Sequence, residues 1–297
     1  MATQPLKSIG IEGFTSIRSA TVALGQLNIL VGANGAGKSN FVQALELLGR
    51  IVDGELGLFV GLNGGASALL TGDGSARARA PGDPAGRRSR APAGPDRGAR
   101  HPAAQRLRGL PLPRHQCRRT GEAAGADGRQ PDTAQRRGQL VAPFFRDFVL
   151  RPDSNDRILL RWQQQDSDAV FSGNQMSDGT LRFVCLATLL LQPELPALVV
   201  LDEPELGLHP FAIVQLAGLL RQASARSQVL IATQSVTLMN QFEIEDLIVV
   251  ERKAGASEFT RPDLATLQEW LDEYSLGELW EKNLLGGRPG REEPAGA

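Results

Sequence analysis

Hydrophobic residues along this chain gather in short runs with two different spacings, which predicts a mixed α/β fold. Some runs are continuous or alternating, are bounded by glycine or polar turns, and indicate strands. The later ones are almost wholly apolar, which is typical of strands buried on both faces of a parallel sheet. The predicted strands are residues 6–14, roughly 19–24, 27–31, 158–162, 169–171, 197–201, 228–233 and 247–250.

Other segments place apolar residues three or four positions apart, which predicts amphipathic helices. Phe41, Leu45 and Leu48 share one such face. Ser177 is a suitable N-cap for a helix that runs to Leu191 and is closed by prolines. Residues 49–71 indicate only a loop with one short element. The remaining predicted helices are residues 40–48, 211–223, 261–270 and 276–280.

Residues 72–140 break this pattern abruptly on both sides. Of these 69 residues, 13 are Ala, 11 Gly, 8 Pro and 15 Arg, and none is Lys, Ile, Phe, Trp, Tyr or Met. Such a segment has little apolar surface to bury, so we expect it to be disordered.

Three interpretations of this anomalous segment are open: a basic nucleic-acid arm, an ordinary linker, or a frame-shifted translation of GC-rich DNA. The abrupt change in composition and the use of Arg without Lys favour the frame shift. The nucleotide sequence of the gene decides between them.

Charge and cysteine content exclude several classes of protein. The net charge is −1, but 15 Arg against 6 acidic residues give the anomalous segment a balance of +9, so the remainder is acidic. The two cysteines, Cys117 and Cys185, stand far apart, so neither a disulfide framework nor a zinc spacing is visible. There is no secretory signal and no apolar run of about 18 residues, so a cytoplasmic protein is expected.

Residues 32–39 read Gly-Ala-Asn-Gly-Ala-Gly-Lys-Ser and fit the phosphate-loop pattern GxxxxGK[ST]. A predicted strand precedes them and a predicted helix follows, so backbone N–H groups and the helix dipole would favour an anion. In such a loop Lys38 reaches the β- and γ-phosphates and the Ser39 hydroxyl is a ligand of Mg²⁺. A chance match in a glycine-rich chain is the alternative, and the flanking elements argue against it.

Two further motifs place polar residues at the ends of apolar elements. Asp202 and Glu203 follow the strand 197–201. Adjacent carboxylates there are costly unless a cation meets them, which indicates Asp202 facing Mg²⁺ and Glu203 beside an attacking water. Ser177-Asp178-Gly179 either simply caps a core helix or approaches a ligand closely, since Gly179 has no Cβ.

In this order the motifs resemble the head of ABC-type ATPases. The run Ile11-Glu12-Gly13-Phe14-Thr15-Ser16 resembles the opening of RecF- and SMC-type ATPases, and the chain is most similar to stand-alone bacterial ATPases related to RecF, SMC and OLD. The resemblance covers residues 6–50 and about 140–285 and fails over the anomalous segment. It implies an α/β P-loop NTPase with a parallel core sheet, an antiparallel β lobe and a helical lobe that the anomalous segment damages.

The resemblance also implies residue roles. Asp202 matches the Walker B aspartate, Glu203 the catalytic base, and Gln234 a positioning residue where many relatives carry histidine. Ser177 matches the signature serine that contacts the γ-phosphate held by a second subunit, whereas His209 is expected to be structural. The expected ATP contacts are Gly32, Asn34, Gly35, Gly37, Lys38, Ser39, Asn40 and Gly179; the catalytic residues are Glu203, Lys38, Gln234 and Ser177; the Mg²⁺ ligands are Ser39 and Asp202.

The resulting hypothesis is Mg²⁺-dependent ATP hydrolysis by a homodimer that closes around ATP, in a DNA-associated repair, maintenance or defence role. DNA as partner rests on family analogy. The alternative is an ATP-dependent binding module or sensor, impaired in hydrolysis, that acts on DNA or a partner protein; a membrane partner is not expected. The chain divides into the N-terminal half of the head (1–71), the anomalous segment (72–140), the C-terminal half (141–285) and a flexible tail (286–297).

Overall fold

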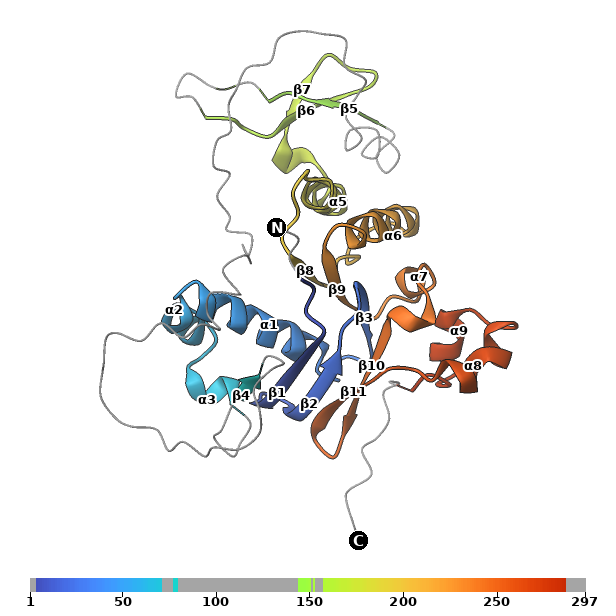
Figure 1. Cartoon of the computed structure of the whole chain (residues 1–297). Coiled ribbons are helices and arrows are strands. Elements are labelled where there is room, and N and C mark those ends of the chain that lie inside the picture. Colours follow the sequence, from blue (N-terminus) through green and yellow to red (C-terminus); the bar gives the residue numbers. More distant parts are fainter. Residues whose placement is uncertain (1–3, 71–76, 80–143, 151, 153–156, 287–297) are drawn as a thin grey trace.

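A computed structural model describes residues 4–70, 77–79, 144–150, 152 and 157–286 (Figure 1). A five-stranded sheet, in the order β11-β10-β3-β9-β8, forms its centre. Four strands are parallel and β11 pairs antiparallel with β10 at one edge. The strands are β3 (Leu27–Val31), β8 (Leu198–Asp202), β9 (Gln228–Thr233), β10 (Leu247–Lys253) and β11 (Ala256–Thr260).

The apolar runs of the sequence become the interior of this sheet. Every residue of β3 and β9 is buried, which confirms that these strands are covered on both faces. One face packs on α5 (Asp178–Leu190) and α6 (Pro210–Ser224), and the other on α1 (Lys38–Val52) and a smaller sheet. The core is therefore a three-layer arrangement around the parallel sheet that the sequence predicted.

The smaller sheet has the order β2-β1-β4 and is antiparallel. It consists of β1 (Ser8–Phe14), β2 (Ile17–Ala23) and β4 (Arg77–Arg79). The first two strands were predicted, but β4 belongs to the anomalous segment, for which disorder was expected. That expectation is wrong for these three residues, because they pair with β1 at Gly10 to Glu12; residues 72–76 and 80–140 lie outside the described residues.

A third sheet, β5-β6-β7, lies beside α5, away from the central sheet (Figure 1). Its strands are β5 (Phe145–Phe148), β6 (Arg161–Gln164) and β7 (Val170–Ser172). Phe145, Trp162 and Met176 are buried together and join this sheet to the start of α5. The strand expected at 158–162 begins only at Arg161, since Ile158 forms an isolated bridge with Pro152.

Several short elements escaped the sequence patterns. The stretch 49–71 contains two helices, α2 (Leu56–Leu62) and α3 (Ala66–Leu69), where one element was expected. The helix α7 (Val236–Met239) and the edge strand β11 were not predicted. The C-terminal helices α8 (Leu264–Leu271) and α9 (Leu276–Glu281) match the predicted positions and cover the end of the core.

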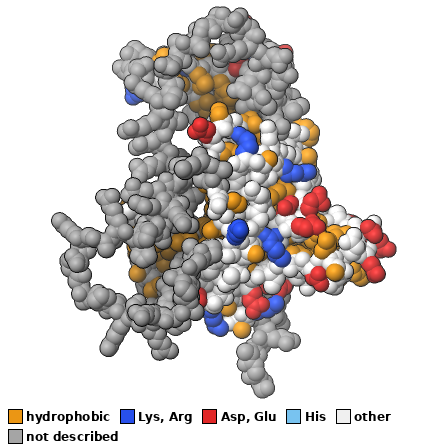
Figure 2. Space-filling view, viewed as in Figure 1, with side chains coloured by type: hydrophobic (Ala, Val, Ile, Leu, Met, Phe, Trp, Pro, Cys, Tyr) orange, Lys and Arg blue, Asp and Glu red, His pale blue; other side chains and the backbone are white. Residues whose placement is uncertain are grey.

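The surface around these last helices is acidic. In Figure 2, red side chains gather over the part of the molecule formed by α8 and α9. Exposed carboxylates there are Glu269, Asp272, Glu273, Glu278 and Glu281. This face would repel a polyanion such as DNA. No helix among the described residues is long and apolar enough to cross a membrane.

Candidate functional site

The predicted phosphate loop lies between β3, which ends at Val31, and α1, which begins at Lys38. Two of its glycines, Gly35 and Gly37, have φ angles of 77° and 114°, in the region that residues with a Cβ rarely adopt. A Cβ on Gly32 would collide with the backbone carbonyl of Val250. The strand–loop–helix prediction is confirmed. Glycine is required at these positions by the positive φ angles or by the close approach of Val250.

Lys38 lies folded against this loop. Its Nζ donates to the carbonyl oxygens of Gly32 at 2.7 Å and Ala33 at 3.1 Å, and the residue is 5% exposed. Burial lowers the pKa of Lys38, while the charges of Glu203 and Asp202 oppose that shift. The lysine of the loop therefore lies within electrostatic reach of the carboxylates after β8.

A hydroxyl network that the sequence did not reveal anchors the loop from behind. Ser257 Oγ on β11 donates to the Ala36 carbonyl at 2.6 Å and lies 2.6 Å from Ser16 Oγ. Asn40 Nδ2 donates to the same Ser16 Oγ at 2.6 Å, so in this structure Asn40 anchors the β1–β2 turn. A Cβ on Gly37 would occupy the position of Ser257. The loop and the edge hairpin are thus packed without intervening space.

The carboxylates predicted to form a Walker B motif stand at the carboxyl end of β8. Asp202 is the last residue of the strand and is exposed. Glu203 has φ 45°, an unusual value for a residue with a side chain, and its N–H donates to the Ala232 carbonyl at 2.8 Å. Gln234 Nε2 donates to Glu203 Oε1 at 3.1 Å. Since β8 and β9 are adjacent parallel strands, their ends bring Glu203 and Gln234 together, as their sequence positions suggested.

A second glutamate in this turn, Glu205, resembles the start of the family loop that crosses the dimer, but its burial and its partner were not predicted from the sequence. Glu205 is only 8% exposed, and its Oε1 accepts a hydrogen bond from the Thr233 hydroxyl. Burial raises the pKa of Glu205, and the hydrogen bond from Thr233 opposes the shift. The one available signal was a third carboxylate in the run after β8, because the contact joins residues that are 28 positions apart.

The predicted signature forms the N-terminus of α5. Ser177 is its N-cap and accepts a hydrogen bond from Thr180 N at 3.2 Å, and Asp178 is exposed in the first turn. A Cβ on Gly179 would collide with the carbonyl of Gly207, so the close approach at this glycine is to the chain's own backbone. The described residues show no hydrogen bond between Ser177 and the phosphate loop.

Arg182, one turn further along α5, strengthens this contact. Its Nη1 donates to the Leu206 carbonyl at 2.9 Å. The turn after β8 therefore touches both Gln234 on one side and the signature helix on the other. His209 ends this turn as the N-cap of α6, where Nδ1 accepts from Phe211 N at 3.2 Å, consistent with the structural role expected for it.

Metal ligation by side chains alone is not a feature of the described part of the chain. Among these residues, no three His, Cys, Asp or Glu side chains group closely enough to hold a metal ion. A Mg²⁺ site that completes its shell with phosphate oxygens and water needs only one or two oxygen ligands from the protein. The Ser39 hydroxyl and the exposed Asp202 carboxylate have the required hard oxygen chemistry.

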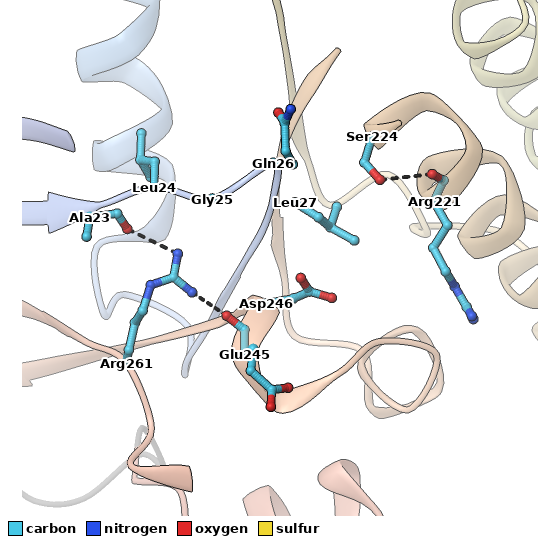
Figure 3. A pocket seen from close by; sticks show the side chains of 10 residues that line it. All are labelled: Ala23, Leu24, Gly25, Gln26, Leu27, Arg221, Ser224, Glu245, Asp246 and Arg261. Carbon is cyan, nitrogen blue, oxygen red and sulfur yellow. Dashed lines mark hydrogen bonds between the residues drawn. The ribbon is translucent and has the colours of Figure 1, made fainter. Parts of the chain in front are cut away.

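A surface cavity of about 630 Å³ lies elsewhere (Figure 3). Its lining includes Leu27, where β3 begins, and Asp246, just before β10 begins, so it opens at the end of the sheet opposite to the phosphate loop. Arg261 borders it but already donates to the carbonyls of Ala23 and Glu245. Position and occupied donors both exclude this cavity as the nucleotide site.

Comparisons with known proteins agree with the geometry. The model of a family described as "AAA domain, putative AbiEii toxin, Type IV TA system" matches residues 27–83 and 73–240, together more than half of the chain. No curated protein matches significantly.

Solved structures give the fold. The Smc head bound to the C-winged helix domain of ScpA is similar over 90% of this chain and 100% of that chain, with 14% identity and a TM-score of 0.59. The SMC head domain from Thermotoga maritima covers 88% of this chain and 100% of its own, with 17% identity and a TM-score of 0.48. At this identity the first likeness establishes the P-loop NTPase fold of an SMC head.

Proposed function

Because the chain belongs to this AAA-domain family, within the RecF/SMC-related group of AAA/ABC-type ATPases, we propose that two copies of it close around ATP and hydrolyse it with Mg²⁺. One observation carries the proposal. The phosphate loop follows β3, Gln234 follows β9 and Glu203 follows β8, so these three lie together at the carboxyl end of adjacent parallel strands, where Gln234 donates to Glu203. That edge is where open α/β sheets bind ligands.

Binding begins with the backbone of the loop. The N–H groups at the start of α1 and the helix dipole favour the phosphates, and Lys38 exchanges the carbonyls of Gly32 and Ala33 for phosphate oxygens. Ser39 and Asp202 would hold Mg²⁺, which, when bound, neutralises charge on the β- and γ-phosphates.

Hydrolysis then requires a positioned base. Glu203 takes the proton of the attacking water as the water oxygen bonds to the γ-phosphorus and the bond to the β–γ bridging oxygen breaks, which gives ADP and phosphate. Gln234 occupies one oxygen of Glu203 and so orients the other toward the water. A glutamine cannot accept the proton, so its part is positioning.

A second copy completes the site in this proposal. Ser177 and Asp178 are exposed at the N-terminus of α5 and make no hydrogen bond to the described phosphate loop of their own chain. A helix start supplies N–H donors to an anion, so the Ser177 end of one copy suits the γ-phosphate on the other. Leu206, 57% exposed beside it, would be covered in the same contact.

DNA is the proposed partner by membership of the RecF/SMC-related group. The acidic face over α8 and α9 restricts any such contact to another surface. The alternative role, an ATP-dependent module that does not hydrolyse, is favoured by one feature, the anomalous segment 72–140 between the two halves of the head.

The first prediction concerns the base. Glu203→Gln should lower kcat on the order of 10²- to 10⁴-fold with ATP binding retained, because the amide cannot take the proton. Steady-state ATPase assays of wild type and variant, with and without duplex DNA and with divalent cations chelated, measure this.

Equal inactivity of the two proteins with intact ATP binding would contradict hydrolysis and favour the binding module. Activity that survives chelation would contradict the Mg²⁺ dependence. Stimulation by duplex DNA would support DNA as the partner, whereas unchanged activity at saturating DNA would count against it.

A further inference from the structure

The turn after β8 carries one more carboxylate than the reaction uses. Glu203 and Asp202 have roles in the proposal, but Glu205 does not. The residue is only 8% exposed, and its Oε1 accepts a hydrogen bond from the Thr233 hydroxyl. Its Oε2 is also buried and has no hydrogen-bond partner among the described residues. Burial of a carboxyl group costs free energy unless both oxygens find partners, so this half-paired group calls for an explanation.

Thr233 shows what the contact fixes. The same Thr233 hydroxyl that donates to Glu205 accepts a hydrogen bond from Ser235 N at 3.0 Å. Gln234, the residue between, reaches back to Glu203 at 3.1 Å. The turn after β8 and the end of β9 are therefore joined by two side-chain hydrogen bonds, one at Thr233 and one at Gln234, and the Thr233 hydroxyl also holds the backbone of Ser235.

We propose that Glu205 is a positioning residue for the ATPase reaction: it holds Thr233 and Ser235 so that Gln234 orients Glu203. This inference rests on the proposed function, since it concerns the same site. Glu205 touches neither Lys38 nor Glu203 through a hydrogen bond in the described structure, so it acts through Thr233.

The chemistry of the contact predicts which substitution is tolerated. Glu205 needs an oxygen that accepts from Thr233, and its burial favours the uncharged carboxyl group. Glutamine keeps an acceptor oxygen and the same shape without charge. Alanine removes the acceptor and leaves the Thr233 hydroxyl unpaired.

The experiment compares Glu205→Ala and Glu205→Gln with wild type, with Glu269→Ala on the exposed face of α8 as a matched control. Glu205→Ala should lower kcat about 10- to 100-fold and change KM for ATP less than about threefold, because misplacement of catalytic groups by about an ångström affects the chemical step. Glu205→Gln should restore kcat to within about threefold of wild type. The control should behave as wild type.

Three results would overturn the inference: wild-type kcat in Glu205→Ala, a loss in KM alone, or a Glu205→Gln protein as slow as the alanine variant. If Glu205→Ala fails to fold, Thr233→Val removes the same hydrogen bond from the other side and should reproduce the loss in kcat, while Thr233→Ser should restore it.

Failure of the proposed function is a different result. A wild-type chain without Glu203-dependent hydrolysis would overturn both ideas together. Hydrolysis that Glu203→Gln abolishes and Glu205→Ala leaves intact would overturn only the role of Glu205.

Discussion

The phosphate loop and the signature helix start are built in opposite ways. The base of the loop is enclosed: Ala36 and Lys38 are 4% and 5% exposed and Ser257 closes it from behind, while Asn34, Gly35 and Ser39 face the solvent. The signature is presented: Ser177 and Asp178 are exposed at the tip of α5. Both are helix N-termini suited to anions, but only the first is surrounded by the rest of its own site.

The difference indicates which anion contacts are made within one chain and which need a second molecule. An enclosed helix start can bind phosphate within one chain, whereas an exposed one, with its N-cap serine turned to solvent, needs a ligand brought by another molecule. In the proposed dimer each chain therefore contributes one complete binding loop and one donor for the other chain's nucleotide.

The largest expected effect comes from mixing two variants, Lys38→Ala and Ser177→Ala, that are each expected to be inactive. Lys38→Ala should lack phosphate binding, and Ser177→Ala should bind ATP without completing the partner's site. Each alone should be inactive, whereas an equal mixture should recover roughly a quarter of wild-type activity, since random pairing gives half heterodimers with one intact site each. ATPase assays at fixed total protein measure the recovery.

No recovery, with heterodimers demonstrated by differential tags, would show that the signature does not act across two chains. ATPase activity of Ser177→Ala on its own would show that Ser177 is not needed at the nucleotide site.

A smaller effect separates the glycines of the two regions. Gly37→Ala places a Cβ on Ser257 at a φ of 114° and should weaken ATP binding about tenfold more than Gly35→Ala, whose Cβ would meet nothing within 4 Å. Gly179→Ala, which collides with the Gly207 carbonyl, should instead leave ATP binding unchanged and lower hydrolysis. Isothermal titration with ATP and turnover assays distinguish these outcomes.

Equal ATP affinity of the Gly37 and Gly35 variants would contradict the enclosed packing of the loop. Loss of ATP binding in Gly179→Ala would contradict the separation of the two regions.

The smallest expected effect is a pH dependence of stability, and it concerns Glu205 in the turn after β8. Burial raises the pKa of Glu205, so its contribution to stability is fully present below the unfolded pKa of about 4.3 and is lost as pH rises through the higher folded pKa. The free energy of unfolding of wild type relative to Glu205→Gln should therefore fall with rising pH above about 4.3, by at most about 1.4 kcal/mol per pH unit. Urea unfolding across a pH series measures the difference.

Glu203 also contributes to the raised pKa of Glu205, so the variants are compared at one ionic strength. A difference that does not change with pH would contradict the raised pKa.

The core of the fold could be predicted because it depends on local pattern. The runs that became β3, β8, β9 and the first half of β10 are mainly apolar, and the loop follows one of them directly. The edge strand β11 was missed since Ala256–Thr260 is short, polar in part and defined by its pairing with β10 rather than by its own composition.

The residues of the site divide in the same way. Lys38, Asp202 and Glu203 belong to short motifs whose chemistry is readable from neighbouring residues. Ser257 and Glu205 act through partners far away in the chain, Ala36 and Thr233, and no local pattern carries that information.

The glycine contact at the start of α5 has a mechanical consequence. The backbone of Gly179 rests on that of Gly207 without a side chain between them, and Arg182 ties α5 to the Leu206 carbonyl. The helix α5 and the turn after β8 are therefore in direct contact. The same turn is also held to the end of β9 through Glu203 and Glu205. In the proposed enzyme, a shift of α5 and the β5-β6-β7 sheet relative to the central sheet would therefore load the turn next to Glu203 from both sides.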